Sequence, residues 1–169
     1  MTIAGHIFTL LGCLIMVAIG VIKSKQHMLI AQCAQFGLQS VGNALLGSAS
    51  GCVAGVVSIV RILAFTKVKK VTPWLKLGFI ALQAALTWFF GATTLVQWLP
   101  VIAMIPYTWY LDTENATLFK VVNVLGVCMW LVHDIWYGIY FSVFFDVLTI
   151  VSTAVGIGLL LRDKKRKER

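Results

Sequence analysis

Hydrophobic residues occur along the chain in seven long runs, which short polar or glycine-containing breaks separate. Each run approaches the roughly 20 residues that a helix needs to cross a bilayer. The pattern therefore predicts an all-α integral membrane protein with seven transmembrane helices. Their expected ranges are 3–22, 28–46, 50–66, 74–90, 94–111, 117–137 and 141–161.

The composition agrees with a membrane protein. Hydrophobic residues make up 60% of the 169 residues and charged residues only 12%, whereas a soluble domain carries about a quarter charged residues. Lys23 and Lys25 follow the first apolar run and do not precede it, which is the wrong order for a cleaved signal peptide. We therefore expect the first run to remain as a helix.

Basic residues set the expected orientation. With seven helices, all 14 Lys and Arg lie on one side of the membrane, which the positive-inside rule makes cytoplasmic. The N-terminus is then outside and the C-terminus inside. If 74–111 were instead one re-entrant feature, the basic tail 162–169 would lie opposite the basic segment 67–70, so we reject that arrangement. The net charge of +8 predicts attraction to anionic cytoplasmic lipid and requires no nucleic-acid partner.

Four amide side chains interrupt the second run at spacings of three, four and four residues, which places them on one face of a helix. They are Gln32, Gln35, Gln39 and Asn43. Uncompensated amides are unfavourable in lipid, so this face is expected to contact other helices or water. The amides either hydrogen-bond neighbouring helices, at about 0.6 kcal/mol each, or line a solute path.

A second polar stripe favours the path. When the chain is shifted by 91 residues, the separation of Gln32 and Asn123, the first three expected helices fall on the last three, and Asp134 matches Asn43. Two such units joined by one helix form a parallel repeat, whose substrate site lies at the interface. The expected divisions are a first repeat at 1–66, a linker helix at 67–91, a second repeat at 92–161 and a basic tail at 162–169.

Asp134 is an acidic residue inside an expected membrane helix and is therefore a functional candidate. Trp130, one helical turn earlier, is expected to face the same path and to stack on a planar or sugar-like solute. His133 is adjacent to Asp134, and because adjacent helical residues point about 100° apart, we expect no pairing between them within the helix. Asp146 is expected either to face the path or to extend outward to water.

Two further sets of residues have expected roles. Arg61 either anchors its helix at the cytoplasmic face or forms a gate with Asp112 or Glu114. Small residues at four positions allow close helix packing, namely Gly47, Gly51, Gly55 and the repeat-related Gly138.

Several stretches resemble the YgjV-type family of bacterial inner-membrane proteins. They are GSASGCVAGVVSIVRILAF, QWLPVIAMIP and GIYFSVFFDVLTIVSTAVGIGLLLR, and the resemblance covers most of the chain from about Gln32 onward. The three-plus-one-plus-three plan is more distantly similar to PnuC vitamin transporters and SWEET sugar facilitators. That similarity implies passage of a small solute through a central pore. The chain departs from those families in lacking a Pro-Gln pair and in having Pro100 and Pro106 without a counterpart in the first helix.

These observations predict a multi-pass inner-membrane transporter or facilitator of a small polar solute, such as a vitamin, nucleoside or sugar, and a homo-oligomer is compatible with the sequence. The alternative is a non-transporting scaffold or accessory subunit whose basic tail binds a partner. We expect no enzyme, because GxSxG, HExxH and Walker-type motifs are absent. We also expect no cofactor or metal, because the four widely spaced cysteines fit packing positions.

Overall fold

The computed structural model describes residues 2–46, 49–68, 71–89, 93–136 and 140–167. Within these ranges the chain forms seven α-helices and no strands. The helices are α1 (Thr2–Val21), α2 (Lys25–Leu45), α3 (Ala49–Lys67), α4 (Pro73–Phe89), α5 (Leu95–Tyr110), α6 (Ala116–Trp136) and α7 (Tyr140–Lys167).

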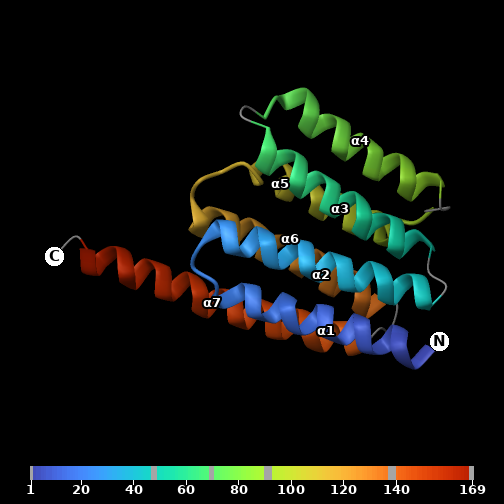
Figure 1. Ribbon diagram of the computed structural model, residues 1–169, viewed down its shortest axis with the longest axis horizontal. Helices are drawn as coiled ribbons and strands as arrows, with labels where there is room; N and C mark the ends of the chain where they lie inside the picture. Colours follow the sequence, from blue (N-terminus) through green and yellow to red (C-terminus); the bar gives the residue numbers. More distant parts are fainter. Residues whose placement is uncertain (1, 47–48, 69–70, 90–92, 137–139, 168–169) are drawn as a thin grey trace.

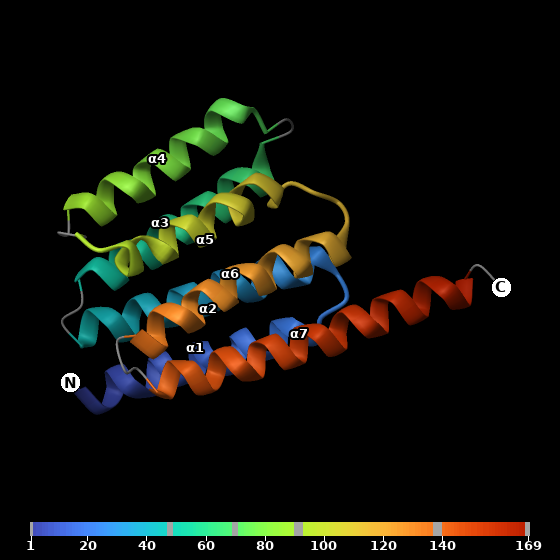
Figure 2. The same cartoon turned by 180° about the vertical axis from the view of Figure 1, so that it is seen from behind.

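The helices form two layers (Figures 1 and 2). α1, α2 and α3 lie side by side in one layer, and α7, α6 and α5 lie behind them in the same order. α1 packs against α7 at one edge, and α4 packs against both α3 and α5 at the other. Because each helix contacts its sequence neighbours and α7 returns to α1, the seven helices form a ring around the space between the layers.

The helices alternate in direction, so the N- and C-termini lie at opposite ends of the bundle (Figure 1). We call the end that holds the α1–α2, α3–α4 and α5–α6 connections the basic end, since Lys23, Lys25, Lys67 and Lys76 lie at or near it. The other end is called the N-terminal end. The last turns of α7 project beyond the bundle at the basic end (Figure 1).

Membrane-spanning character is clear for three helices among the described residues. Ile3–Val21, Ala116–Trp136 and Tyr140–Arg166 are long and apolar enough to cross a bilayer. α4 and α5 have 17 and 16 residues, slightly fewer than the roughly 20 usually needed. α2 carries the four amide side chains Gln32, Gln35, Gln39 and Asn43, here called the amide stripe, which lower its hydrophobicity. The presence of seven helices agrees with the expectation, while the crossing of the membrane by all seven remains a prediction.

The helix bounds differ from the expected ranges mainly in α7. It continues through the basic segment to Lys167, because Lys, Arg and Asp163 include no helix breaker and Lys and Arg have good helix propensity. The re-entrant arrangement that the charge pattern excluded is not observed, since α4 and α5 are separate helices. α5 begins with a capping box in which Gln97 Oε1 accepts hydrogen bonds from the backbone N–H groups of Thr93 and Thr94 at 2.7 and 2.9 Å.

The hydrophobic core fills the basic end of the bundle. It joins the last turns of α1, α3 and α5 to the first turns of α2 and α6. Its buried residues are Ile19, Met28, Leu29, Ile62, Phe65, Tyr107, Leu111, Phe119 and Val122. The rings of Tyr107 and Phe119 pack with their centroids 5.7 Å apart. The two layers are therefore sealed against each other at this end, and space between them remains nearer the N-terminal end.

Candidate functional site

A cavity of about 530 Å³ lies between the two layers and receives side chains from all seven helices. The amide stripe of α2 forms one wall, and polar residues of α6 face it. Every residue expected on the solute path lines this cavity, namely Gln32, Gln35, Gln39, Asn43, Asn123, Trp130 and Asp134. α4, the expected linker helix, also contributes, because Gln83 is a lining residue.

The surroundings of the amide stripe differ from one end of α2 to the other. At the basic end, Gln32 is buried and its Oε1 accepts a 2.7 Å hydrogen bond from the Tyr107 hydroxyl of α5. Further along, the Gln35 Nε2 lies 3.5 Å from the Gln39 Oε1. Gln32 thus acts as an interhelical packing contact, while Gln39 and Asn43 are half-buried on the cavity wall.

Acidic side chains gather at the other end of the cavity. The His133 Nδ1 lies 2.7 Å from the Asp134 Oδ1, so the expectation that these neighbours do not pair within the helix is wrong. Their Cβ atoms diverge, but rotation of the two side chains about their own bonds brings the ring nitrogen and the carboxylate together across the helix surface. The Trp130 ring stands edge-on to His133 with centroids 5.5 Å apart.

Asp146 of α7 belongs to the same end of the cavity. It is a lining residue and only 6% exposed, so it does not extend outward to water. Within the described residues, its Oδ2 is buried without a hydrogen-bond donor. The sequence already indicated a possible functional role for Asp146, because an acidic residue inside an apolar membrane run is a functional candidate.

Arg61 does not form the expected gate. Its guanidinium is 1% exposed, donates to the Thr108 hydroxyl at 3.2 Å and to the Ser58 hydroxyl at 3.4 Å, and lies 5.0 Å from the centroid of the Tyr107 ring. Among the described residues it has no ion pair with Asp112 or Glu114. The reason is directional: Arg61 points inward toward α5, whereas both acidic residues lie in the connection after that helix.

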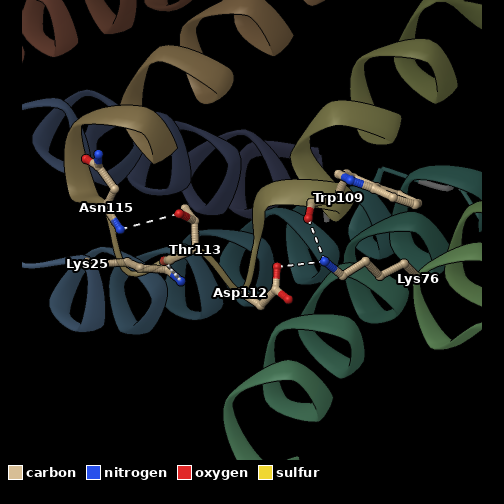
Figure 3. Close-up of polar contacts among 6 residues, drawn as sticks. All are labelled: Lys25, Lys76, Trp109, Asp112, Thr113 and Asn115. Carbon is tan, nitrogen blue, oxygen red and sulfur yellow. Dashed lines mark hydrogen bonds and ion pairs between the residues drawn. The ribbon is translucent and has the colours of Figure 1, made fainter. Parts of the chain in front are cut away.

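The acidic connection between α5 and α6 is instead held by two lysines (Figure 3). The Lys76 Nζ of α4 lies 2.8 Å from both the Trp109 carbonyl and the Asp112 carboxylate. Lys25, which precedes the predicted span 28–46, donates to the Thr113 carbonyl. Burial lowers the pKa of the Lys25 ammonium, and the charges of Asp112 and Glu114 oppose that shift. These contacts fasten the connection to both α2 and α4 at the basic end.

Lys120 is a buried cation, and the distribution of charged residues along the sequence does not predict its burial. It is 1% exposed, and its ammonium donates to the carbonyls of Ile19 and Gly20 in the last turn of α1. Free carbonyls at a helix C-terminus favour a cation. Lys120 therefore serves as a cap that joins α6 to α1.

The glycines expected to pack helices fall into two groups. A Cβ on Gly55 of α3 would clash with the Ser40 hydroxyl of α2 and lie 3.2 Å from the Phe36 carbonyl, so the two backbones approach closely there. Gly51 lies within α3, whereas Gly47 and Gly138 lie outside the described residues. Over the described part of the chain, no group of three or more His, Cys, Asp or Glu is arranged to hold a metal ion.

Comparison with known proteins identifies a family. The model of a family described as "Imp-YgjV: Bacterial inner membrane protein" matches residues 3–164, nearly the whole chain. No curated protein and no solved structure matches significantly.

Proposed function

The chain belongs to the Imp-YgjV family of bacterial inner membrane proteins, and from this premise we propose that it is a multi-pass facilitator or transporter of a small polar solute. The proposed substrate is of vitamin, nucleoside or sugar size. No catalytic step is part of the proposal.

The cavity is the observation that carries this proposal. Amides of α2 converge on one space with Asn123 and Asp134 of α6, although these helices are far apart in sequence. Its volume of about 530 Å³ lies within the roughly 300–1,000 Å³ typical of sites for small molecules. Polar side chains at membrane depth are expensive unless they face water, a ligand or one another, and a cavity between them fits passage of a solute better than packing alone.

The proposed mechanism moves the layers against each other. In it, α1–α3 and α5–α7 are two parallel repeats and α4 is the linker, so the substrate site lies between the repeats. The core and the Gln32, Tyr107 and Arg61 contacts close the cavity at the basic end. If the positive-inside rule holds, this end is cytoplasmic, and the conformation is closed toward the cytoplasm. Transport then requires these contacts to separate while the N-terminal end closes.

One feature favours the alternative, a scaffold or accessory subunit. The basic end of α7 projects from the bundle (Figure 1), and Arg162, Lys164, Lys165 and Arg166 are exposed. Such a helix suits anionic lipid at the cytoplasmic surface, at about 1 kcal/mol per basic residue, or an acidic protein partner. The scaffold role requires no cavity, so the presence of the cavity favours transport over the scaffold role.

Uptake into proteoliposomes tests the proposal. Vesicles containing the purified protein are incubated with a pool of small polar metabolites, and the retained compounds are identified by mass spectrometry. We expect selective retention that Asn43→Leu reduces, because the substitution removes a lining amide. Gln26→Leu is the matched control, since Gln26 is an exposed amide of the same helix outside the cavity. No retention of any compound by a folded protein contradicts transport and favours the scaffold.

A further inference from the structure

Two carboxylates meet in the cavity at the end remote from the hydrophobic core. Asp134 lies near the end of α6 and Asp146 in the second turn of α7, and each is 6% exposed. Both line the cavity, and their charges interact. Two neighbouring buried negative charges repel each other and have lost most of their hydration, so the arrangement favours either a proton on one carboxyl group or a positive charge that joins them.

The hydrogen bonds of the two carboxylates are not equally satisfied. The Asp134 Oδ1 has His133 Nδ1 at 2.7 Å, whereas the Asp146 Oδ2 is buried with no donor in the described part of the chain. Buried polar atoms of folded proteins almost always have a partner. An unpartnered oxygen on a residue that lines a cavity is therefore positioned to receive a hydrogen bond from a ligand.

The only basic side chain among the described residues that line the cavity is that of His133, which already pairs with Asp134. Among the described residues that line the cavity there is no Lys or Arg. Arg61 is held by the Thr108 and Ser58 hydroxyls toward the basic end, and Lys120 is held by the carbonyls at the end of α1. Both buried cations thus have other partners, and within the described residues Asp146 has no basic side chain beside it, so a ligand is the remaining source of a positive charge for this carboxylate.

The surroundings select the kind of cation. A metal ion is a poor fit, because the described residues contain no cluster of metal-binding side chains. The Asp146 oxygen favours a ligand with an N–H donor. The aromatic rings of Trp130 and Phe145 also line the cavity and offer faces that attract an ammonium group. Asn43 and Ser142 provide hydrogen-bonding groups for the rest of the ligand.

We propose that the solute carries a protonated primary or secondary amine and that Asp146 binds its ammonium group, with Asp134, oriented by His133, as the second carboxylate. This inference rests on the proposed function, because it names the chemical class of the transported solute. It narrows the substrate from small polar solutes in general to organic amines.

Binding to the detergent-solubilised protein tests the inference without requiring transport. The probes are two pairs that differ only by an amine in place of a hydroxyl, glucosamine with glucose and ethanolamine with ethylene glycol, together with choline, which lacks an N–H. Each is titrated in mildly alkaline buffer while the melting temperature is followed. We expect at least one amine to raise the melting temperature saturably, at concentrations at which its hydroxyl counterpart and choline do not.

Substitutions then locate the site. Asp146→Asn is expected to weaken amine binding at least about tenfold, because it removes a charge-assisted hydrogen bond. Asp163→Asn, a half-exposed position of the same helix outside the cavity, is the matched control and should bind as the unsubstituted protein does. If Asp146→Asn does not fold, Asp146→Glu and Asp134→Asn replace it, with partial and strong loss expected. Equal binding of amines and hydroxyl counterparts, no binding of any amine, or equal effects at Asp146 and Asp163 overturns the inference.

The outcomes separate this inference from the proposed function. If neutral solutes are taken up and Asp146→Asn does not affect their uptake, the proposed transport is supported and the proposed amine selectivity is rejected. If amines bind in a manner that depends on Asp146 but no flux occurs in proteoliposomes, the amine site is supported and the proposed transport is rejected.

Discussion

Tyr107 of α5 donates a 2.7 Å hydrogen bond to Gln32 of α2, and this bond joins the two helical layers at the closed end of the cavity. Arg61 lies over the Tyr107 ring and donates to Thr108 of the same helix. Tyr107 is 4% exposed and Thr108 is fully buried, so neither hydroxyl has water as an alternative partner. These contacts hold α2, α3 and α5 together, and their separation is what opening at the basic end requires.

A double-mutant cycle measures the bond between Tyr107 and Gln32. Tyr107→Phe leaves the buried Gln32 oxygen without its donor and should lower the free energy of unfolding by about 1 kcal/mol. Adding Gln32→Leu to Tyr107→Phe should cost less than Gln32→Leu alone, with a coupling energy of about 0.5–1.5 kcal/mol. Unfolding in detergent by denaturant gives these values.

Tyr110→Phe provides the control for that cycle, because Tyr110 lies on the same helix and is 40% exposed. It should change the free energy of unfolding by less than about 0.5 kcal/mol. Strict additivity of the Tyr107 and Gln32 substitutions would show that the bond does not join the layers.

Gly55 tests the close packing of α2 and α3. Gly55→Ala should destabilise the protein by about 1–3 kcal/mol, since the new methyl group meets the Ser40 hydroxyl and the Phe36 carbonyl. The cost should fall in a Ser40→Ala background, which removes the nearest atom. Thermal unfolding of the single and double variants checks both statements.

Gly78→Ala is the matched glycine substitution on α4. A Cβ on Gly78 meets nothing within 4 Å, so alanine should be neutral or stabilise by up to about 1 kcal/mol through its helix propensity. Similar losses at Gly55 and Gly78 would argue against a specific close approach of α2 and α3.

Asp146→Asn should raise the thermal stability of the ligand-free protein. The amide that replaces the unpartnered carboxylate carries no charge, so the repulsion between two buried charges is removed. We expect a gain of several degrees in melting temperature, accompanied by loss of function, as is common for strained functional sites. Asp163→Asn should leave the melting temperature within about a degree, because its exposed ion pair with Lys23 contributes little. A lower melting temperature for Asp146→Asn would indicate a structural role instead.

Orientation in the membrane follows from the distribution of basic residues and is checked with reporter fusions. A fluorescent protein fused to the C-terminus should fold and fluoresce, and alkaline phosphatase fused there should be inactive, because the basic end is expected in the cytoplasm. The reverse pattern would place the Gln32, Tyr107 and Arg61 contacts at the outer face and would invert the proposed transport cycle.

The helices and one wall of the cavity were predictable from the sequence, because both depend on local periodicity. Apolar runs of membrane length define the helices, and amides three or four residues apart must share a helical face, as Gln32, Gln35, Gln39 and Asn43 do. The partners of long side chains were not predictable. For Arg61 the sequence left open either anchoring at the cytoplasmic face or a gate with Asp112 or Glu114, yet the direction of its side chain places it against Thr108. Likewise, the bond between His133 and Asp134 depends on rotamers that residue spacing does not determine.

We propose that the space between the layers is an aqueous route, and the accessibility of introduced cysteines shows whether water reaches it. In a variant whose native cysteines are replaced, Asn123→Cys places a thiol on the cavity wall, and Leu125→Cys places one on the outer, 52% exposed face of the same helix. A charged, membrane-impermeant thiol reagent is added to either side of sealed vesicles. We expect Asn123→Cys to be modified from both sides while Leu125→Cys is not. If Asn123→Cys is as unreactive as Leu125→Cys from both sides, the space between the layers is not an aqueous route.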